Sequence, residues 1–246
     1  MSYQWVKSSF LAVFVLFFLG GCHYSNSKGS NYQPTSDSTV VSPAPVPVPT
    51  ATPDKAIIID DAKLVDIQSV SKNIVVDIRY ATSNNFLKRK VYSEARCILR
   101  YGVAKKLAKV QEDLAKNQLG LKVYDCYRPL SVQKLMWLFK PDDRFVANPA
   151  QGSRHNRGAA VDLTLVDSNG KELEMPSDFD SFTPASHRNY SGASIQALLN
   201  RQLLDSAMQK QGFFGLSTEW WHFDASGWKN FPVMDVPFNQ VKSSEH

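Results

Sequence analysis

A polar, proline-rich stretch over residues 25–55 separates a part of the chain that cannot build a hydrophobic core from a part that can. The stretch is dominated by Ser, Asn, Thr and Pro and contains the run SPAPVPVPT from Ser42. Alternating prolines hold a backbone extended, and there is little apolar side chain to bury, so we expect a polyproline-like spacer. The folded unit is therefore predicted to be one domain, residues 56–246, of ordinary single-domain size.

The segment before the spacer has the layout of an export signal. Residues 1–21 carry one positive charge, Lys7, followed by an apolar run over residues 10–19, which is shorter than the ~20 residues of a membrane-spanning helix. Two glycines then precede Cys22, an order that resembles a bacterial lipobox. We predict a lipoprotein signal peptide over residues 1–21 and a lipidated Cys22 that begins a tether over residues 22–55. The alternative is an uncleaved signal anchor with an incidental cysteine.

Export also changes what the three cysteines can do. If Cys22 carries the lipid, Cys97 and Cys126 remain in an oxidising compartment, where they are candidates for a disulfide; two buried free thiols are the alternative. His23, rather than an aspartate, follows Cys22. We therefore expect an exported protein that is lipid-anchored to a bacterial membrane on its periplasmic side, the outer membrane in a Gram-negative cell.

The formal net charge of +5 does not indicate nucleic-acid binding. The basic residues are scattered singly and in short groups, such as Lys105 and Lys106 or residues 88–90, and do not form a basic arm. We expect mostly solvated lysines and no nucleic-acid partner. A cationic envelope would still suit an anionic bacterial wall or membrane.

Hydrophobic periodicity predicts three helices. Apolar positions spaced four, three and four apart indicate an amphipathic helix over residues 97–116, which Gly120 ends; they are Val103, Leu107, Val110 and Leu114. A second helix is expected after Pro129, with Ser131 as its cap. A third is expected over residues 194–210. The apolar stripe of this third helix consists of Ile195, Leu198, Leu199 and Leu203.

Short β-rich runs lie between these helices. They fall at residues 57–59, 74–78, 121–126, 160–165 and 219–223. Strands mixed with helices in this order are typical of an α+β domain. We expect a single domain with a central, mostly antiparallel sheet flanked by helices.

Two segments combine histidine with carboxylate. SRHNRGAAVD begins at Ser153 and EWWH begins at Glu219. Each has an ordinary interpretation, because a histidine in a polar loop is usually solvated and an aspartate often ends a strand. Together, His155, Asp162 and His222 provide the three protein ligands of a catalytic zinc with an open water position. Glu219 is a spare carboxylate for proton transfer, but a bulge or strand end must bring it to the same face as His222, three residues away.

The strings S-x-H-x-x-G-x-A-x-D and E-x-W-H resemble those of the zinc D-alanyl-D-alanine dipeptidases of the VanX type. These belong to a wider fold group that includes D,D-carboxypeptidases and peptidoglycan endopeptidases. The resemblance covers nearly all of residues 56–240. It implies one zinc ion per chain on the sheet, ligated by His155, Asp162 and His222, and Glu219 as the general acid/base.

The same resemblance carries over to three more residues. Arg128, in the segment Tyr-Arg-Pro, matches the family's arginine that stabilises the tetrahedral oxyanion, a task that suits a permanently charged guanidinium. Ser153 and Asp180 are implied to bind the free amino group of a dipeptide. A buried carboxylate left without its ammonium is costly, and this would reject longer chains. The residues before Phe179 read Met-Pro-Ser-Asp, where the family usually shows Met-Gly-Thr.

The resemblance thus implies zinc-dependent hydrolysis of D-alanyl-D-alanine to two D-alanines in cell-wall peptide metabolism. The first alternative is a D,D-carboxypeptidase or peptidoglycan endopeptidase that takes a stem peptide with the same zinc chemistry. The second is a non-catalytic, wall-binding lipoprotein. Export favours the first alternative, because wall peptides lie outside the cell, whereas the matches at Asp180 and Arg128 favour the dipeptidase.

Overall fold

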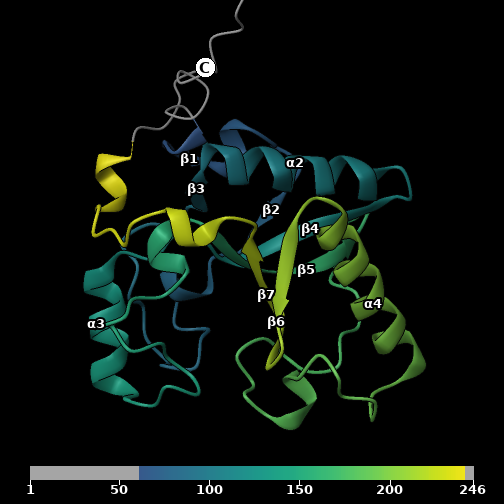
Figure 1. Cartoon of the computed structure of the whole chain (residues 1–246). Coiled ribbons are helices and arrows are strands. Elements are labelled where there is room, and N and C mark those ends of the chain that lie inside the picture. The colour runs from purple at the N-terminus through teal and green to yellow at the C-terminus, as the bar shows by residue number, and fades with distance from the viewer. Residues whose placement is uncertain (1–60, 242–246) are drawn as a thin grey trace, which may run out of the picture. The chain divides into compact units, whose positions relative to one another are not determined.

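A five-stranded sheet in the order β2-β4-β5-β7-β6 organises the described part of the chain (Figure 1). The computed structural model describes residues 61–241, so the predicted leader, tether and strand at residues 57–59 lie outside the described residues. The strands of this sheet are β2 (Val75–Val76), β4 (Leu119–Asp125), β5 (Ala160–Asp167), β6 (Phe213–Leu216) and β7 (Glu219–Ala225). Only β2 and β4 pair in parallel; the other neighbours are antiparallel. The predicted α+β class with a mostly antiparallel sheet is confirmed.

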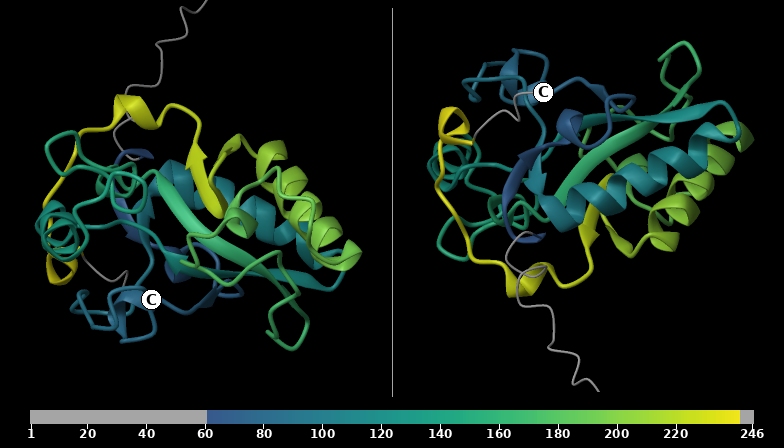
Figure 2. Two further views of the ribbon diagram at one scale, coloured as in Figure 1. Left: turned by 90° about the horizontal axis from the view of Figure 1, so that it is seen from below. Right: turned by 90° about the horizontal axis from the view of Figure 1, so that it is seen from above.

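Two short strands and three helices complete the layers. β1 (Leu64–Asp66) pairs antiparallel with β3 (Ile98–Arg100), and the helices are α2 (Tyr101–Ala115), α3 (Leu130–Phe139) and α4 (Ile195–Lys210). Figure 2 shows α2 and α4 side by side against the sheet, whereas α3 stands apart at the opposite edge of the domain. Within the described residues, no helix has the length and apolar character needed to cross a membrane.

The first predicted helix is present, but it starts later and ends earlier than expected. Residues 98–100 are a strand because they pair with β1, and α2 begins only at Tyr101. Gly120 does not end the helix: the chain turns at Gln118, whose φ is +59°, and Gly120 already belongs to β4. A Cβ on Gly120 would lie 3.1 Å from the Gln111 side-chain nitrogen, so glycine here permits close packing of β4 on α2.

The caps and faces of the other helices correct two further predictions. Ser131 does not cap α3; its own N–H donates to the carboxylate of Asp235 at 2.8 Å, which therefore takes the capping role from the C-terminal segment. Ser194 does cap α4 and accepts from the N–H of Ala197. Three residues of the stripe expected on α4, Ile195, Leu199 and Leu203, are exposed, and Leu198 is half-buried. The helix turns another face to the core. That core face consists of Ala197, Asn200, Leu204 and Met208.

The described residues form a hydrophobic core. Its buried side chains run from Val65 to Val241 and come from every layer of the fold. A disulfide between Cys97, just before β3, and Cys126, just after β4, ties the small sheet to the large one. Because this segment buries its own core and carries its own covalent link, we treat it as a unit that folds without residues 1–50.

Candidate metal centre and active-site cavity

The register of the three central strands places two carboxylates and an imidazole in one row. Asp125 at the end of β4 pairs with Asp162 on β5, and Asp162 pairs with His222 on β7. Cross-strand partners share a face of the sheet, so these three side chains are neighbours. A bulge in β4 makes the row possible: the pairing slips between Val123 and Asp125, and Tyr124 is the extra residue.

The loop before β5 supplies the second imidazole. His155 begins a short 3-10 helix (His155–Arg157) that ends at Gly158, where φ is +66°. The backbone N–H of His155 donates to Ser153 Oγ at 3.0 Å, and its carbonyl accepts from the N–H of Arg128 at 3.1 Å. A Cβ on Gly158 would lie 3.0 Å from the side chain of Leu64. Backbone bonds on both sides therefore fix the position of His155 over the sheet.

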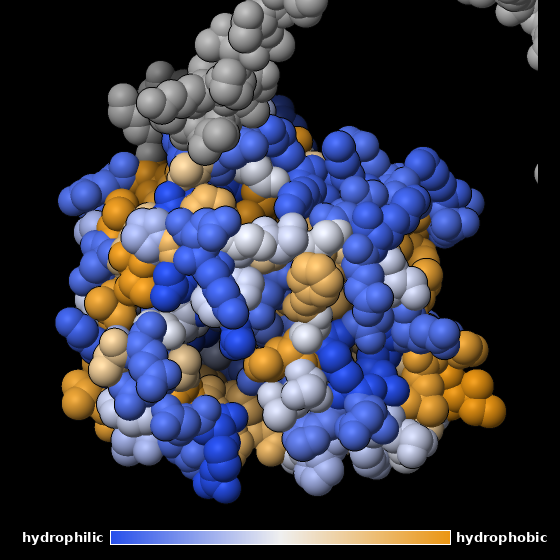
Figure 3. Space-filling view, in the orientation of Figure 1, coloured by the Kyte–Doolittle hydropathy of each residue, from blue (hydrophilic) through white to orange (hydrophobic). Residues whose placement is uncertain are grey.

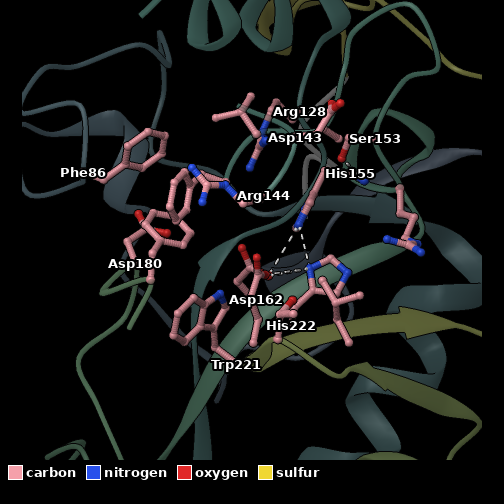
Figure 4. A pocket seen from close by; sticks show the side chains of 18 of the residues that line it. Phe86, Arg128, Asp143, Arg144, Ser153, His155, Asp162, Asp180, Trp221 and His222 are labelled. Carbon is pink, nitrogen blue, oxygen red and sulfur yellow. Dashed lines mark hydrogen bonds and ion pairs between the residues drawn. The ribbon is translucent and has the colours of Figure 1, made fainter. Parts of the chain in front are cut away.

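Three donor atoms converge at one point between these elements (Figure 4). His155 Nε2 lies 3.2 Å from His222 Nδ1, and Asp162 Oδ1 lies 3.4 Å and 2.9 Å from those two atoms. Ligand atoms of all three residues fall within 4.8 Å of one another. This is the size of a cluster that surrounds a single metal ion, and the donor types suit zinc.

The outer hydrogen bonds of the two imidazoles leave the converging nitrogens free to bind a metal ion. His155 Nδ1 donates to the carbonyl of Cys126 at 2.7 Å, and His222 Nε2 donates to Asp224 Oδ1 at 2.9 Å. Each ring thus carries its proton on the outer nitrogen, as metal-binding histidines do. The two inner nitrogens lie 3.2 Å apart beside Asp162, an arrangement that favours a cation between them, either a proton or a metal ion. The residues present therefore fit a metal ion.

The electrostatics of the cluster lead to the same conclusion. Burial disfavours a charged His222, but hydrogen bonds with Asp162 and Asp224 raise its pKa to about 10. Burial would raise the pKa of Asp162, yet the two imidazoles hold it well below its usual range. The cluster stabilises positive charge at this point, and a divalent metal ion supplies such a charge.

An irregularity between β6 and β7 brings Glu219 to the metal cluster. The pairing passes from Gly215 with Phe223 to Leu216 with Glu219, so the residues between Glu219 and Phe223 bulge out of the ladder. As a result, Glu219 Oε2 lies 4.0 Å from His222 Nδ1. This is the bulge that the three-residue spacing required. Burial raises the pKa of the Glu219 carboxyl.

Arg128 is held rigidly at the end of β4. Its Nη2 donates to Asp125 Oδ2 at 2.6 Å, its Nη1 donates to Gln133 at 2.8 Å, and its Nε donates to the hydroxyl of Tyr92 at 3.4 Å. Burial disfavours the guanidinium charge, but Asp125 outweighs this and raises the pKa of Arg128. Three of its five N–H groups are used, so two remain available to a ligand.

These side chains line one cavity of about 750 Å³. The seven residues expected from the sequence to form the site all contribute to it: Arg128, Ser153, His155, Asp162, Asp180, Glu219 and His222. Figure 4 shows Asp180 at one side of the cavity, Ser153 at the other and the metal cluster between them. That both residues bind the substrate ammonium stays a prediction.

Asp180 occupies a strained turn in the cavity wall. Its φ is +58°, a left-handed value that is uncommon outside glycine, and strain of this kind gathers at functional sites. The hydroxyl of Tyr80 donates to both of its carboxylate oxygens, at 3.2 and 3.0 Å. Burial and the nearby charge of Asp162 raise the pKa of Asp180 well above its usual range. A cation bound beside it would restore the ionised form.

Three residues that sequence reasoning missed support this site. Asp125 anchors Arg128, Asp224 holds the proton of His222, and Arg188 donates to the carbonyls of the β7 bulge. Asp224 had a readable signal, since it follows His222 by two residues and a strand would place both on one face. No sequence pattern indicated a role for Arg188, because this residue lies in a separate loop.

Comparison with known proteins agrees with this geometry. The D-ala-D-ala dipeptidase family profile matches residues 60–244. The D-alanyl-D-alanine dipeptidase of Escherichia coli (strain K12) is 34% identical over 180 residues, covering 73% of this chain and 93% of the relative. That of Enterococcus faecium is 32% identical over 168 residues, covering 60% of this chain and 83% of the relative.

A solved structure of the D,D-pentapeptidase VanY in complex with Zn(II) aligns with a TM-score of 0.35 and 15% identity, covering 64% of this chain and 81% of that chain. The family match spans the whole described domain, and the relatives are matched over most of their length. The chain belongs to the D-ala-D-ala dipeptidase family of peptidases.

Proposed function

We propose that this chain is a zinc metallopeptidase that hydrolyses D-alanyl-D-alanine to two D-alanines. The observation that carries the proposal is the convergence of His155 Nε2, Asp162 Oδ1 and His222 Nδ1 in one cavity. The carboxylate of Glu219 and the guanidinium of Arg128 line the same cavity. Family membership and the activity named for the relatives support the same reaction.

One zinc ion per chain would be held by His155, Asp162 and His222. Bound there, zinc would acidify a water molecule and polarise the scissile carbonyl. The protein's part is to keep both histidine rings in the correct tautomer, through the Cys126 carbonyl and Asp224.

Glu219 is suited to move the proton. Its side chain is 17% exposed, and burial raises its pKa, which makes the carboxylate a stronger base than a solvated glutamate and suits it to take a proton and return it. We assign to the Oε atoms of Glu219 the removal of a proton from the attacking water. The same carboxyl then delivers that proton to the departing amine.

Arg128 is suited to stabilise the developing oxyanion. Its buried contacts with Tyr92, Asp125 and Gln133 fix the guanidinium before substrate arrives, so no reorganisation is needed during the reaction. The two N–H groups not used in these contacts can donate to the oxygen of the tetrahedral species.

Asp180 and Ser153 define the direction in which a dipeptide lies. The carboxylate of Asp180 pairs with the substrate ammonium at one side of the cavity. In this proposal Asp180 alone binds the ammonium, since Figure 4 shows Ser153 on the other side of the metal cluster. The carboxylate end of the substrate then lies toward Ser153, whose oxygen already accepts from the N–H of His155 and whose hydroxyl hydrogen can donate to an anion. A free dipeptide satisfies both ends.

The contrast with a carboxypeptidase or endopeptidase rests on Asp180. A stem peptide has an amide where the dipeptide has an ammonium, so it would leave this carboxylate without a cation. The free dipeptide is therefore the favoured substrate. The deciding assay compares D-alanyl-D-alanine, its N-acetylated form and a pentapeptide stem on the zinc-loaded protein.

We expect cleavage of the free dipeptide and little cleavage of the other two. Glu219→Gln should retain zinc and lose turnover by at least about 10²-fold. Efficient cleavage of the stem peptide would replace the dipeptidase proposal with the carboxypeptidase. Wild-type kcat in Glu219→Gln would remove the assigned role of that residue.

We further propose that the chain is exported and lipid-anchored through Cys22 on the periplasmic side of a bacterial membrane. The support is the leader sequence, together with a disulfide between Cys97 and Cys126 that suits an oxidising compartment. Metabolic labelling with a radioactive fatty acid should label the wild-type chain and not Cys22→Ser. Equal labelling of both would exclude lipidation at this residue.

A further inference from the structure

The outward face of α3 carries a group of exposed apolar side chains. Leu135, Leu138 and Phe139 are 37%, 77% and 42% exposed, and their spacing places them on one side of the helix. We call these three residues the α3 patch. Figure 3 shows orange surface over this helix at the left edge of the molecule, interrupted by blue. Large exposed apolar groups of this kind commonly mark a contact surface.

Basic residues lie in the segments beside the α3 patch. The guanidinium of Arg89 lies 4.0 Å from the ring centre of Phe139, and Lys88 and Lys90 beside it are exposed. Lys134 and Lys140 are exposed on the same helix and just beyond its end. The loop that follows α3 adds the exposed Arg144, which pairs with Asp142, and the exposed Asp143. Residues 88–90, α3 and residues 140–144 together carry six basic and two acidic side chains, so positive charge predominates in the segments beside the patch.

We propose that the α3 patch docks this domain on an anionic phospholipid bilayer. Apolar and aromatic side chains bordered by Lys and Arg are the composition of helices that lie in a membrane interface, where the apolar groups enter the acyl boundary and the cations meet anionic headgroups. Both parts of that composition are on this face. A second copy of the chain fits less well, because symmetric pairing would bring the same basic residues against each other.

A comparison with the exposed apolar stripe on α4 shows why the basic residues favour α3 as the membrane-docking surface. Ile195 and Leu199 are 79% and 54% exposed, so α4 is at least as apolar at its surface as α3. Of residues 195–210 only two are basic: Arg201, which donates to the carbonyls of His187 and Tyr190, and Lys210, which pairs with Asp113 at the far end of the helix. The helix therefore gives the α4 stripe few cations, and the stripe serves as the matched control.

Docking through the α3 patch would place the bilayer beside the catalytic cavity. Arg144 and Phe145 follow α3 directly and line that cavity. Lys140 and Arg144 both lie over the ring of Phe145, at 4.5 and 5.3 Å. The basic border of the α3 patch is therefore continuous with the cavity wall. The inference does not depend on the proposed reaction or on a lipid at Cys22.

The test is co-sedimentation of residues 51–246 with vesicles of phosphatidylcholine alone or mixed with phosphatidylglycerol. We expect binding only to the anionic vesicles, weakening as salt is raised. Leu135→Gln with Leu138→Gln should lower the partition coefficient at least about tenfold. Lys88→Gln with Lys90→Gln should lower it about fivefold for each charge removed. Ile195→Gln with Leu199→Gln should leave it unchanged.

Several outcomes would overturn the proposal. Equal binding to neutral and anionic vesicles, or an equal loss in the α4 control, would show non-specific adsorption. No vesicle binding would exclude the bilayer as partner, and a dimer in solution that Leu138→Gln dissociates would assign the α3 patch to self-association. Circular dichroism and dipeptide hydrolysis should be unchanged in all the variants, since the substituted side chains are exposed and lie outside the catalytic cavity.

Discussion

Asp224 should set the affinity for zinc without touching the metal. Its Oδ1 accepts from His222 Nε2 at 2.9 Å, which keeps the proton on that nitrogen and leaves Nδ1 to face Asp162 and His155. In Asp224→Ala the outer nitrogen loses its acceptor. The ring can then place its proton on Nδ1 and can rotate, and both changes oppose metal binding.

The expected magnitude follows from the kind of contact that is lost. Removing the hydrogen-bond partner of a metal-binding histidine typically weakens metal affinity 10- to 100-fold, which is about 1.4 to 2.7 kcal/mol. Asp224 Oδ2 also pairs with Arg154 Nε at 2.9 Å, but Arg154 is 37% exposed and can be rehydrated, so the fold should lose little. Asp224→Asn should lie between wild type and alanine, because its amide oxygen can still accept from His222.

The assay is competition for zinc against a chromophoric chelator, with thermal unfolding of the metal-free proteins as the measure of the fold. Asp235→Ala is the control, since Asp235 accepts from the N–H of Ser131 at α3 and touches no donor atom of the cluster. Unchanged zinc affinity in a folded Asp224→Ala would refute the argument about the tautomer. A matching loss in Asp235→Ala would show that the effect is general destabilisation.

Three further substitutions test other parts of the site. Arg128→Lys keeps the charge but loses the paired donors, so kcat should fall about 10²- to 10³-fold with zinc affinity unchanged; steady-state kinetics showing wild-type kcat would contradict the oxyanion role. Asp180→Asn keeps an acceptor for Tyr80 and removes the charge, so KM for the dipeptide should rise about 10- to 100-fold and discrimination against its N-acetylated form should shrink. An unchanged KM would show that Asp180 does not bind the substrate ammonium. Cys97→Ala with Cys126→Ala removes a disulfide that spans 29 residues and should lower the free energy of unfolding, measured by urea titration, by about 3 to 4 kcal/mol. A loss below about 1 kcal/mol would argue against a stabilising disulfide.

Periodicity predicted the helices well but not always the face that each one buries. In α2 the predicted apolar positions, Val103 and Leu107 among them, are the buried ones. In α4 the pattern identified residues that share a face, but not which face meets the core. Asn200 lies on the core side because its amide donates to the carbonyl of Glu174 at 2.9 Å, and the apolar stripe is left outside. That contact joins residues 26 positions apart, which a local pattern cannot reveal.

The site itself was more predictable than the packing. Each metal ligand sits in a short string whose residue types already suit zinc, so local sequence was enough to propose His155, Asp162 and His222. What the strings could not contain is the support from neighbouring strands. Asp125 lies in the row of Asp162 and His222 only because β4 carries a bulge, and the bulge depends on pairing that forms in three dimensions.

The position of Glu219 depends most on a residue outside the catalytic strings. For Glu219 and His222 to face the same point, β7 must leave its ladder with β6, which exposes backbone carbonyls that would cost energy if unpaired. Arg188 fills that opening: it donates to the carbonyls of Leu216, Trp220 and His222 at 2.9, 3.0 and 2.7 Å.

The bulge in turn requires room for the guanidinium of Arg188. Gly215 provides it, because a Cβ at that position would clash with the Arg188 side chain, and Asp205 forms an ion pair with the same guanidinium. A chain could therefore carry both zinc-binding strings and still fail to align its base with its metal, if it lacked this arginine and glycine. The two sequence motifs around His155 and His222 supply the metal ligands and the base, and the β6–β7 bulge brings the carboxylate of Glu219 close to those ligands.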